Sequence, residues 1–298
     1  MVDFSNGAAY IGGQMLPIDQ AKISILDWGF LHSDATYDVA HVWKGKFFRL
    51  DDHIDRFFSG MSKLRMSIPH SRNELHSIMV NCVRASGLRK AYVEMICTRG
   101  TPKPGSRDPR TCTNRFYAFA IPFVWIATPE KQANGLHLIV SRHQRIPPES
   151  VDPTVKNYHW LDLVMGLFEA YDRGGETTVL VDHEDNLVEG PGFNIFSVKR
   201  RSITTPDRGV LEGITRRTVM ELAIECGFKV ALGHLAADKV RTADEVFATS
   251  TAGGILPITK IDGQTIGSGI PGPVTKELQK RYWALHEDPQ YTIKIDYT

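Results

Sequence analysis

Lys156 is the residue of this chain whose surroundings best suit covalent chemistry. It follows a loop stiffened by Pro147, Pro148 and Pro153, and an apolar run over 161–171 comes shortly after it. A lysine held by a rigid loop against an apolar element can be partly desolvated, and an uncharged amine condenses with an aldehyde to form a Schiff base. Most lysines are solvated surface charges, so the case for Lys156 depends on what else the chain carries.

Glu189 could serve a cationic ring nitrogen. It lies at the end of a predicted strand over 187–189, and the Gly-Pro-Gly run at 190–192 stiffens the chain after it. A carboxylate fixed in this way can pair with a protonated nitrogen of a bound ring. Taken alone, Glu189 is better explained as a solvated charge in a turn.

Three segments could bind a phosphate group. Residues 213–215 precede a predicted helix over 215–226, and free N–H groups at a helix start attract anions. The turn over 249–254 offers hydroxyls and glycine N–H groups. Arg56 lies beside the apolar stripe of a helix that Asp51 is predicted to cap, and it could donate two parallel hydrogen bonds. The alternatives are Thr215 as an N-cap, an ordinary glycine turn and a surface arginine.

The elements that would position these groups follow from the hydrophobic pattern. A strand over 35–43 places Tyr37, Val39, His41 and Trp43 on one face. Glu94 lies in a second, apolar strand, where a buried carboxylate needs a partner. In the first half, the pattern further predicts a helix capped by Ser71 and Glu74, and strands over 91–98 and 115–123 that flank a polar loop over 99–114. In the second half, it predicts helices over 158–173 and 273–286. The strands predicted there lie over 136–140, 178–181, 194–198, 202–204, 229–232 and 245–249. Strands in both halves with helices packed outside favour an α+β fold.

Length and composition set the outer bounds. A chain of 298 residues favours two domains: a small N-terminal α/β domain over 1–124, a connection over 125–135, and a larger C-terminal domain over 136–298 that carries Lys156. The 35 basic and 34 acidic side chains give a net charge of +1, so the sequence shows no excess of positive charge for binding nucleic acid or an anionic membrane. Four scattered cysteines disfavour a metal site, and with a polar N-terminus and no long apolar run they suggest a cytoplasmic protein.

An amine nucleophile, an acid for a ring nitrogen and several phosphate donors are together the groups that a pyridoxal phosphate enzyme needs. The sequence resembles the fold-type IV (class IV) pyridoxal phosphate-dependent transaminases, and within them most closely the (R)-selective amine transaminases. The stretches that carry the resemblance are Leu26–Val39, Phe48–Arg56, Val151–Asn157, Val188–Asn194, Leu211–Arg216 and Thr249–Gly254. The resemblance implies a two-domain α+β fold like that of the D-amino acid and branched-chain aminotransferases, with the active site between the domains at a dimer interface.

The resemblance also implies roles for individual residues. Lys156 would carry pyridoxal 5'-phosphate as a Schiff base and move protons as general acid and base. Glu189 would pair with the pyridine nitrogen, and Leu211 would pack against the ring. The phosphate would be bound by Arg56, Ile214, Thr215 and Thr251. The substrate would be bound by His32, Tyr37, Val39, Tyr92, Glu94, Arg107 and Trp160, with Arg110 as the alternative to Arg107. His41 stands where relatives can carry a small residue.

The function that follows is a homodimeric aminotransferase of the 2.6.1 class. It would move an amino group from an (R)-amine, or D-alanine, to a ketone or a 2-oxo acid such as pyruvate. The alternative on the same scaffold is a branched-chain or D-amino acid aminotransferase. A lyase acting on an aminochorismate-like compound and a non-catalytic sugar- or phosphate-binding protein are more distant alternatives.

Overall fold

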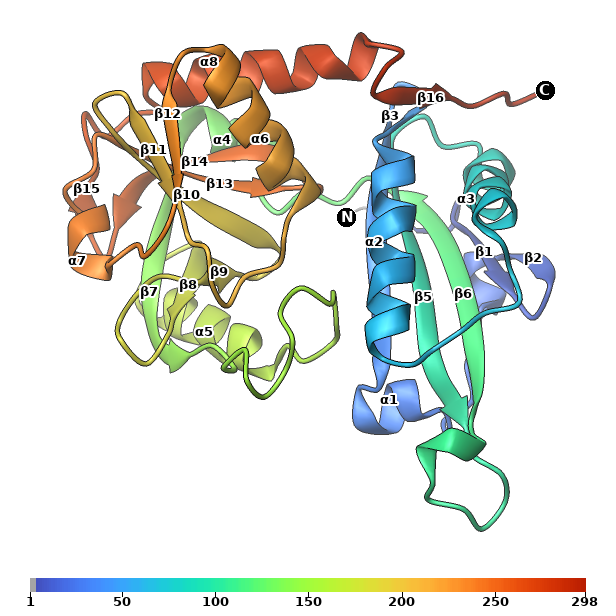
Figure 1. Ribbon diagram of the computed structural model, residues 1–298. Helices are drawn as coiled ribbons and strands as arrows, with labels where there is room; N and C mark the ends of the chain where they lie inside the picture. The colour runs from blue at the N-terminus through green and yellow to red at the C-terminus, as the bar shows by residue number, and fades with distance from the viewer. Residues whose placement is uncertain (1–3) are drawn as a thin grey trace. The chain divides into compact units, whose positions relative to one another are not determined.

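The computed structural model describes residues 4–298, so the first three residues of the polar N-terminal stretch lie outside it. The chain divides into two compact units, whose elements are labelled in Figure 1. Unit 1 comprises the chain up to Val124, Val155–His159 and His286–Thr298, and unit 2 comprises Trp125–Thr154 and Trp160–Leu285. The sequence placed Lys156 in the second domain. The structure groups it with unit 1 because its backbone is hydrogen-bonded to residues 36 and 37.

Unit 1 is built on a seven-stranded sheet in the order β16-β4-β3-β5-β6-β1-β2. Its elements are β1 (Ala8–Ile11), β2 (Gln14–Pro17), η1 (Ile18–Gln20), α1 (Trp28–His32), β3 (Ala35–Trp43), β4 (Lys46–Phe48), α2 (Leu50–Lys63), α3 (Arg72–Ser86), β5 (Ala91–Thr101), η2 (Pro109–Thr111), β6 (Thr113–Pro122), η3 (Leu285–Glu287, beginning in unit 2) and β16 (Thr292–Lys294). Every pairing in this sheet is antiparallel.

The predicted alternation of β3 explains how the unit 1 sheet is used. Ala40 and Val42 belong to the core that α2 and α3 cover (Figure 1), with Phe57 and Met79 as large buried members from the two helices. Tyr37, Val39 and His41 therefore point to the opposite face of the strand. Both faces of β3 are buried, so the strand carries a functional face and a core face at once.

Of two predicted helix caps in unit 1, one is confirmed and the other is wrong. The capping box of Ser71 and Glu74 at the start of α3 is confirmed, and Gly87 ends that helix in a left-handed conformation. Asp51 is not the cap of α2, because the helix already begins at Leu50 and its N-cap residue is Arg49 in a left-handed conformation. The acidic side chains at 51 and 52 instead lie in the first turn, where their negative charge interacts favourably with the positive end of the helix dipole.

Unit 2 contains a nine-stranded mixed sheet, with a main path β12-β11-β10-β13-β14-β7-β8. Its elements are α4 (Pro129–Asn134), β7 (Leu136–Gln144), α5 (Leu161–Asp172), β8 (Thr177–Val181), β9 (Glu189–Gly190), β10 (Phe193–Lys199), β11 (Ser202–Thr205), α6 (Ile214–Glu225), β12 (Lys229–Leu232), α7 (Ala237–Val240), β13 (Glu245–Ser250), β14 (Gly254–Ile261), β15 (Gln264–Thr265) and α8 (Pro273–Ala284). β9 pairs with β10, and β15 pairs with β14.

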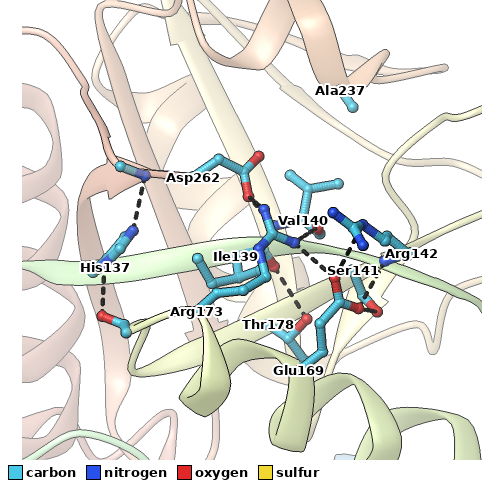
Figure 2. Close-up of polar contacts among 12 residues, drawn as sticks. His137, Ile139, Val140, Ser141, Arg142, Glu169, Arg173, Thr178, Ala237 and Asp262 are labelled. Carbon is cyan, nitrogen blue, oxygen red and sulfur yellow. Dashed lines mark hydrogen bonds and ion pairs between the residues drawn. The ribbon is translucent and has the colours of Figure 1, made fainter.

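A charged network fastens α5 to the sheet of unit 2. Figure 2 shows Arg173, just past the end of α5, between the carboxylates of Glu169 and Asp262. Its Nη1 also donates to the carbonyl of Val140 at 3.0 Å. Glu169 in turn accepts from the hydroxyl of Ser141 at 2.8 Å. The network is partly exposed and connects three segments of one unit, so its role is structural.

The helix predicted over 158–173 begins three residues later than expected. Asn157 forms a β-bridge with Thr36, and this pairing holds residues 157–159 with unit 1 instead of letting them enter α5. Within residues 4–298, no helix is both long and apolar enough to cross a membrane.

Candidate active site

Lys156 is fixed to the start of β3 through its backbone. Its carbonyl accepts hydrogen bonds from the Thr36 hydroxyl at 2.8 Å and from the Tyr37 N–H at 3.1 Å. Val155, the preceding residue, is buried. These contacts fix the backbone of Lys156. Its side-chain Nζ lies over the Tyr37 ring, 4.4 Å from the centroid. The surface against which the amine rests is therefore the aromatic face of Tyr37, and not the apolar run over 161–171 that the sequence suggested.

A buried carboxyl group stands beside this amine. Glu94 is paired across the sheet with Val39, so its side chain lies on the same face as Tyr37 and Val39. Its Oε1 accepts a hydrogen bond of 2.6 Å from the Tyr158 hydroxyl. Burial raises the pKa of Glu94, and hydrogen bonds from Tyr158 and Tyr92 and the charge of Lys156 act against that rise. The partner that a carboxylate in an apolar strand requires is therefore a pair of tyrosines.

Arg56 is held by Asp38. Its Nε donates to Oδ2 of Asp38 at 2.7 Å and its Nη2 donates to Oδ1 at 2.9 Å, a two-pronged pair. Nδ1 of His53 lies 2.8 Å from the same carboxylate. Burial alone would raise the pKa of Asp38, but the Arg56 charge and the His53 contact outweigh it and hold that pKa well below its usual range. The predicted phosphate ligand thus has a fixed orientation, because Asp38 engages its Nε and Nη2 together.

His41 does not line an open pocket in unit 1. Its Nε2 lies 2.7 Å from Nε2 of His286, and both side chains are buried. Phe48 stacks on the His286 ring at 4.1 Å between centroids. Burial, followed by the neighbouring His286, lowers the pKa of His41 well below its ordinary value. His41 therefore anchors the C-terminal segment to β3.

Glu189 in unit 2 is a buried carboxylate with an arginine partner. Its Oε1 accepts from Nε of Arg145 at 3.2 Å, and its Oε2 accepts from the backbone N–H of Leu211 at 2.9 Å. Arg145 also donates to Asp162 at 2.7 Å, so one guanidinium serves two acids. Both oxygens of the Glu189 carboxylate are thus held in a fixed orientation, as pairing with a cationic ring nitrogen requires.

Glu189 begins a row of polar side chains on one sheet face. It pairs with Asn194 across β9 and β10, and Asn194 pairs with Thr249 across β10 and β13. Directly paired residues share a face. Asn194 donates to the Leu211 carbonyl at 2.9 Å, so both Glu189 and Asn194 hold the loop that leads into α6. The Thr249 Oγ1 is buried and has no hydrogen-bond partner within residues 4–298.

The start of α6 has the features of an anion site. The N-cap residue is Gly213, which provides no side-chain cap, so Thr215 is not the cap but the second residue of the helix. A Cβ on Gly213 would lie 2.1 Å from Oδ1 of Asn194, so the approach to the helix requires glycine. The turn after β13 places Thr251 beside Gly253 and Gly254, both at positive φ. Uncapped N–H groups, a fixed acid and an unpaired buried hydroxyl within unit 2 fit a ring that carries a phosphate.

Four other predicted substrate-binding residues lie at helix ends or in the loop after β5. His32 ends α1, is exposed and has its ring against Trp28. Trp160 is the N-cap residue of α5. Arg110 is exposed and its guanidinium is occupied by Asp108 at 2.6 Å. Arg107 is exposed in the same loop and has no such pair among the described residues, which leaves it as the better candidate.

Sequence reasoning missed five residues that build the site: Asp38, His53, Arg145, Tyr158 and Asn194. Two of them could have been found. Asp38 lies on the core face of β3, where a carboxylate requires a cation, and His53 and Arg56 are spaced three apart on the next helix. Arg145, Tyr158 and Asn194 gain their roles from contacts with distant parts of the chain, for which the sequence offers no local signal.

The family model for amino-transferase class IV matches residues 35–261. The chain belongs to that family and has the fold-type IV architecture. A branched-chain-amino-acid aminotransferase of Pseudomonas aeruginosa is 34% identical over 242 residues, 80% of this chain and 78% of that protein. A D-alanine aminotransferase of Bacillus licheniformis is 31% identical over 271 residues, 90% of this chain and 93% of that protein.

A solved structure agrees with this assignment. The branched-chain aminotransferase of the thermophilic archaeon Thermoproteus uzoniensis, crystallised with norvaline, superimposes with a TM-score of 0.88 at 26% identity, covering 97% of this chain and 99% of that one. Pyridoxamine 5'-phosphate is present in another branched-chain amino acid aminotransferase structure, which superimposes with a TM-score of 0.91 at 27% identity and covers 99% of this chain and 100% of that one. None of the proteins named here is an (R)-selective amine transaminase, so that narrower resemblance stays a prediction.

Proposed function

We propose that this class IV aminotransferase uses pyridoxal 5'-phosphate to transfer an amino group from an (R)-amine, or D-alanine, to a ketone or a 2-oxo acid such as pyruvate. When bound, the cofactor supplies an aldehyde for the amine and an electron sink for carbanion character. The protein would be a homodimer that works in the cytoplasm, which its four free cysteines suit.

The proposed roles of the residues follow from the family resemblance and are supported by their surroundings. Nζ of Lys156 would hold the cofactor through its aldehyde carbon and, once displaced from it by the donor amine, would be free to carry a proton to and from the donor carbon. Glu189, held by Arg145 and Leu211, keeps the ring nitrogen protonated. Arg56, the first turn of α6 and Thr251 bind the phosphate, and Leu211 packs against the ring.

The observation that favours a simple amine as donor is the wall around Lys156. In unit 1 that wall contains the carboxyl of Glu94 and the rings of Tyr37 and Tyr158. Arg56, on the other face of β3, is paired with Asp38. An aromatic amine can place an apolar group on the Glu94 side and so avoids charge repulsion there, whereas D-alanine would have to direct its carboxylate away from Glu94.

A branched-chain aminotransferase is the second candidate, and it is favoured by the activities named for the Pseudomonas aeruginosa relative and the Thermoproteus uzoniensis structure. The two proposals are separated by half-reactions, in which the visible absorption of the holoenzyme is followed after adding one donor. We expect (R)-1-phenylethylamine and D-alanine to bleach the band, and (S)-1-phenylethylamine to leave it unchanged. Fast reaction with L-leucine and none with the (R)-amine would overturn the first proposal.

The cofactor lysine has its own test. Borohydride treatment of the holoenzyme should fix the label on Lys156, as peptide mass spectrometry can show. The Lys156→Ala protein should lose both the label and the transaminase activity. Lys131, an exposed lysine of unit 2 paired with Glu176, provides a control for non-specific labelling.

A further inference from the structure

Tyr158 contacts both groups that surround the Lys156 amine. Its ring stacks on Tyr37 with centroids 4.3 Å apart and an interplanar angle of 13°. Tyr37 is the ring over which Nζ of Lys156 lies. The Tyr158 hydroxyl also donates to Glu94 at 2.6 Å. One side chain therefore sets the position of the aromatic face and of the acid beside the amine.

The backbone explains why these contacts are fixed. Asn157 bridges to Thr36, and the Lys156 carbonyl accepts two hydrogen bonds from β3. Residues 156 and 158 flank the bridged residue, and both side chains contact the ring of Tyr37. The amine and the tyrosine are thus presented together to one face of β3.

We propose that Tyr158 is a positioning residue for Lys156: through Glu94 it holds a negative charge beside the amine, and through Tyr37 it holds the ring on which the amine rests. The inference rests on the proposed role of Lys156 as the cofactor amine. Tyr158 would act on Lys156 only through Glu94 and Tyr37, and it would not itself donate or accept the transferred proton.

The electrostatic part of this role has a definite sign. Burial raises the pKa of Glu94, and the hydrogen bond from Tyr158 opposes that rise. Burial and the nearby Glu94 raise the pKa of Tyr158 far above its ordinary range, so the hydroxyl keeps its proton and remains a donor. Removing the hydroxyl moves Glu94 toward its neutral form. A neutral Glu94 stabilises positive charge on the Lys156 nitrogen less well, so that nitrogen loses its proton at lower pH.

The first experiment titrates the visible absorption of the holoenzyme with pH, without substrate, in Tyr158→Phe, Glu94→Gln and the double variant. Tyr158→Phe keeps the ring and removes the hydroxyl. We expect its absorption midpoint to move to lower pH, as in Glu94→Gln, and the double variant to add little, because both act through one interaction. Tyr171→Phe, an exposed tyrosine of α5, is the matched control.

The second experiment distinguishes a positioning role of Tyr158 from a role in the stability of the fold. We expect Tyr158→Phe to lower kcat for the amine donor about tenfold, the size of one hydrogen bond to a charged group, with KM changed less. Tyr158→Leu, which also removes the stack on Tyr37, should lower kcat further. Thermal unfolding of each variant reports whether the protein has folded.

The proposal is overturned if a folded Tyr158→Phe protein has the absorption midpoint and kcat of the Tyr171→Phe control, or if its shift adds fully to that of Glu94→Gln. Failure of the proposed role of Lys156 gives a different result, because the Lys156→Ala protein would then retain the visible band whatever Tyr158 does.

Discussion

His41 and His286, which are 245 positions apart in the sequence, meet through Nε2 atoms 2.7 Å apart in the interior of unit 1. One ring must donate and the other accept, so at least one is neutral. The lowered pKa of His41 means that the fold favours its neutral form. As the pH falls below about 6.5, the ordinary value for histidine, the unfolded chain takes up the proton first. The stability that depends on neutral His41 is therefore present at neutral pH and is lost as the pH falls.

The pair predicts acid sensitivity in unit 1. As the pH falls from about 6.5 to about 5, protonation of His41 in the unfolded chain should lower the free energy of unfolding, by at most about 1.36 kcal/mol for each pH unit. His41→Gln keeps a hydrogen-bonding side chain that does not titrate, so its unfolding free energy should change less over this interval. Chemical denaturation at the two pH values measures it, with His76→Gln on α3 as the control. Equal pH dependence in both variants would contradict the prediction.

Asp38 should be required for the stability of unit 1. Asp38→Asn leaves Arg56 and His53 facing a neutral amide at a fully buried position. Breaking a buried ion pair on one side typically costs about 3–5 kcal/mol. Asp55→Asn, an exposed acid on the same helix as Arg56, should cost well under about 1 kcal/mol. Comparing the two denaturation curves tests the point, and similar midpoints would refute it.

Arg145 is predicted to maintain the acid of the cofactor site. Arg145→Met removes its ion pairs with Glu189 and Asp162, whose side chains are only 10% and 11% exposed. We expect the holoenzyme to release pyridoxal 5'-phosphate more easily, with affinity reduced at least about tenfold, or about 1.4 kcal/mol. Arg142→Met, at an 88% exposed side chain nearby, should retain wild-type affinity. Fluorescence titration of the apoenzyme with the cofactor gives both values.

Gly213 should tolerate no side chain. In Gly213→Ala the new Cβ would lie 2.1 Å from Oδ1 of Asn194, so the start of α6 or the Leu211 loop must move. The expected result is weaker binding of inorganic phosphate and of the cofactor. Gly233→Ala is the matched control, because nothing lies within 4 Å of a Cβ there. Unchanged affinity in Gly213→Ala would show that the α6 start does not contact the phosphate.

The loop after β5 offers a test of acceptor binding. Arg107→Ala should raise KM for pyruvate and leave KM for a ketone acceptor unchanged, because only pyruvate brings a carboxylate for the guanidinium to hold. Arg110→Ala is the internal control, since Arg110 is already engaged by Asp108. Steady-state kinetics with the two acceptors decides between them. A larger effect from Arg110 would exchange the two assignments.

Local patterns carried much of the fold. The alternation over 35–43 predicted which residues share a face of β3, but not which face belongs to the core, and the capping box at Ser71 predicted the start of α3. Strand β14 was missed because Thr251 to Gly254 reads as an isolated turn, although the chain continues into an apolar strand after it. The short strand β16 was missed because three residues have too little pattern and gain their order from pairing with β4.

Site residues were predictable where a motif is contiguous, and not where a contact is distant. Lys156 and Glu189 each lie in a short, recognisable stretch. Their immediate partners come from elsewhere: Tyr37 lies far before Lys156 in the chain, and Arg145 lies 44 residues before Glu189. The sequence could name the reacting groups, but the groups that tune them depend on which strands are neighbours in the sheet.

The pairing of β16 with β4 has a consequence for synthesis on the ribosome. Residues 286–298 belong to unit 1 but follow the whole of unit 2 in the chain. Until they emerge, the first 124 residues present β4 as an open edge and His41 without His286. Exposed edges of this kind invite pairing with other chains. The nascent protein must therefore protect that edge through the translation of more than half its length.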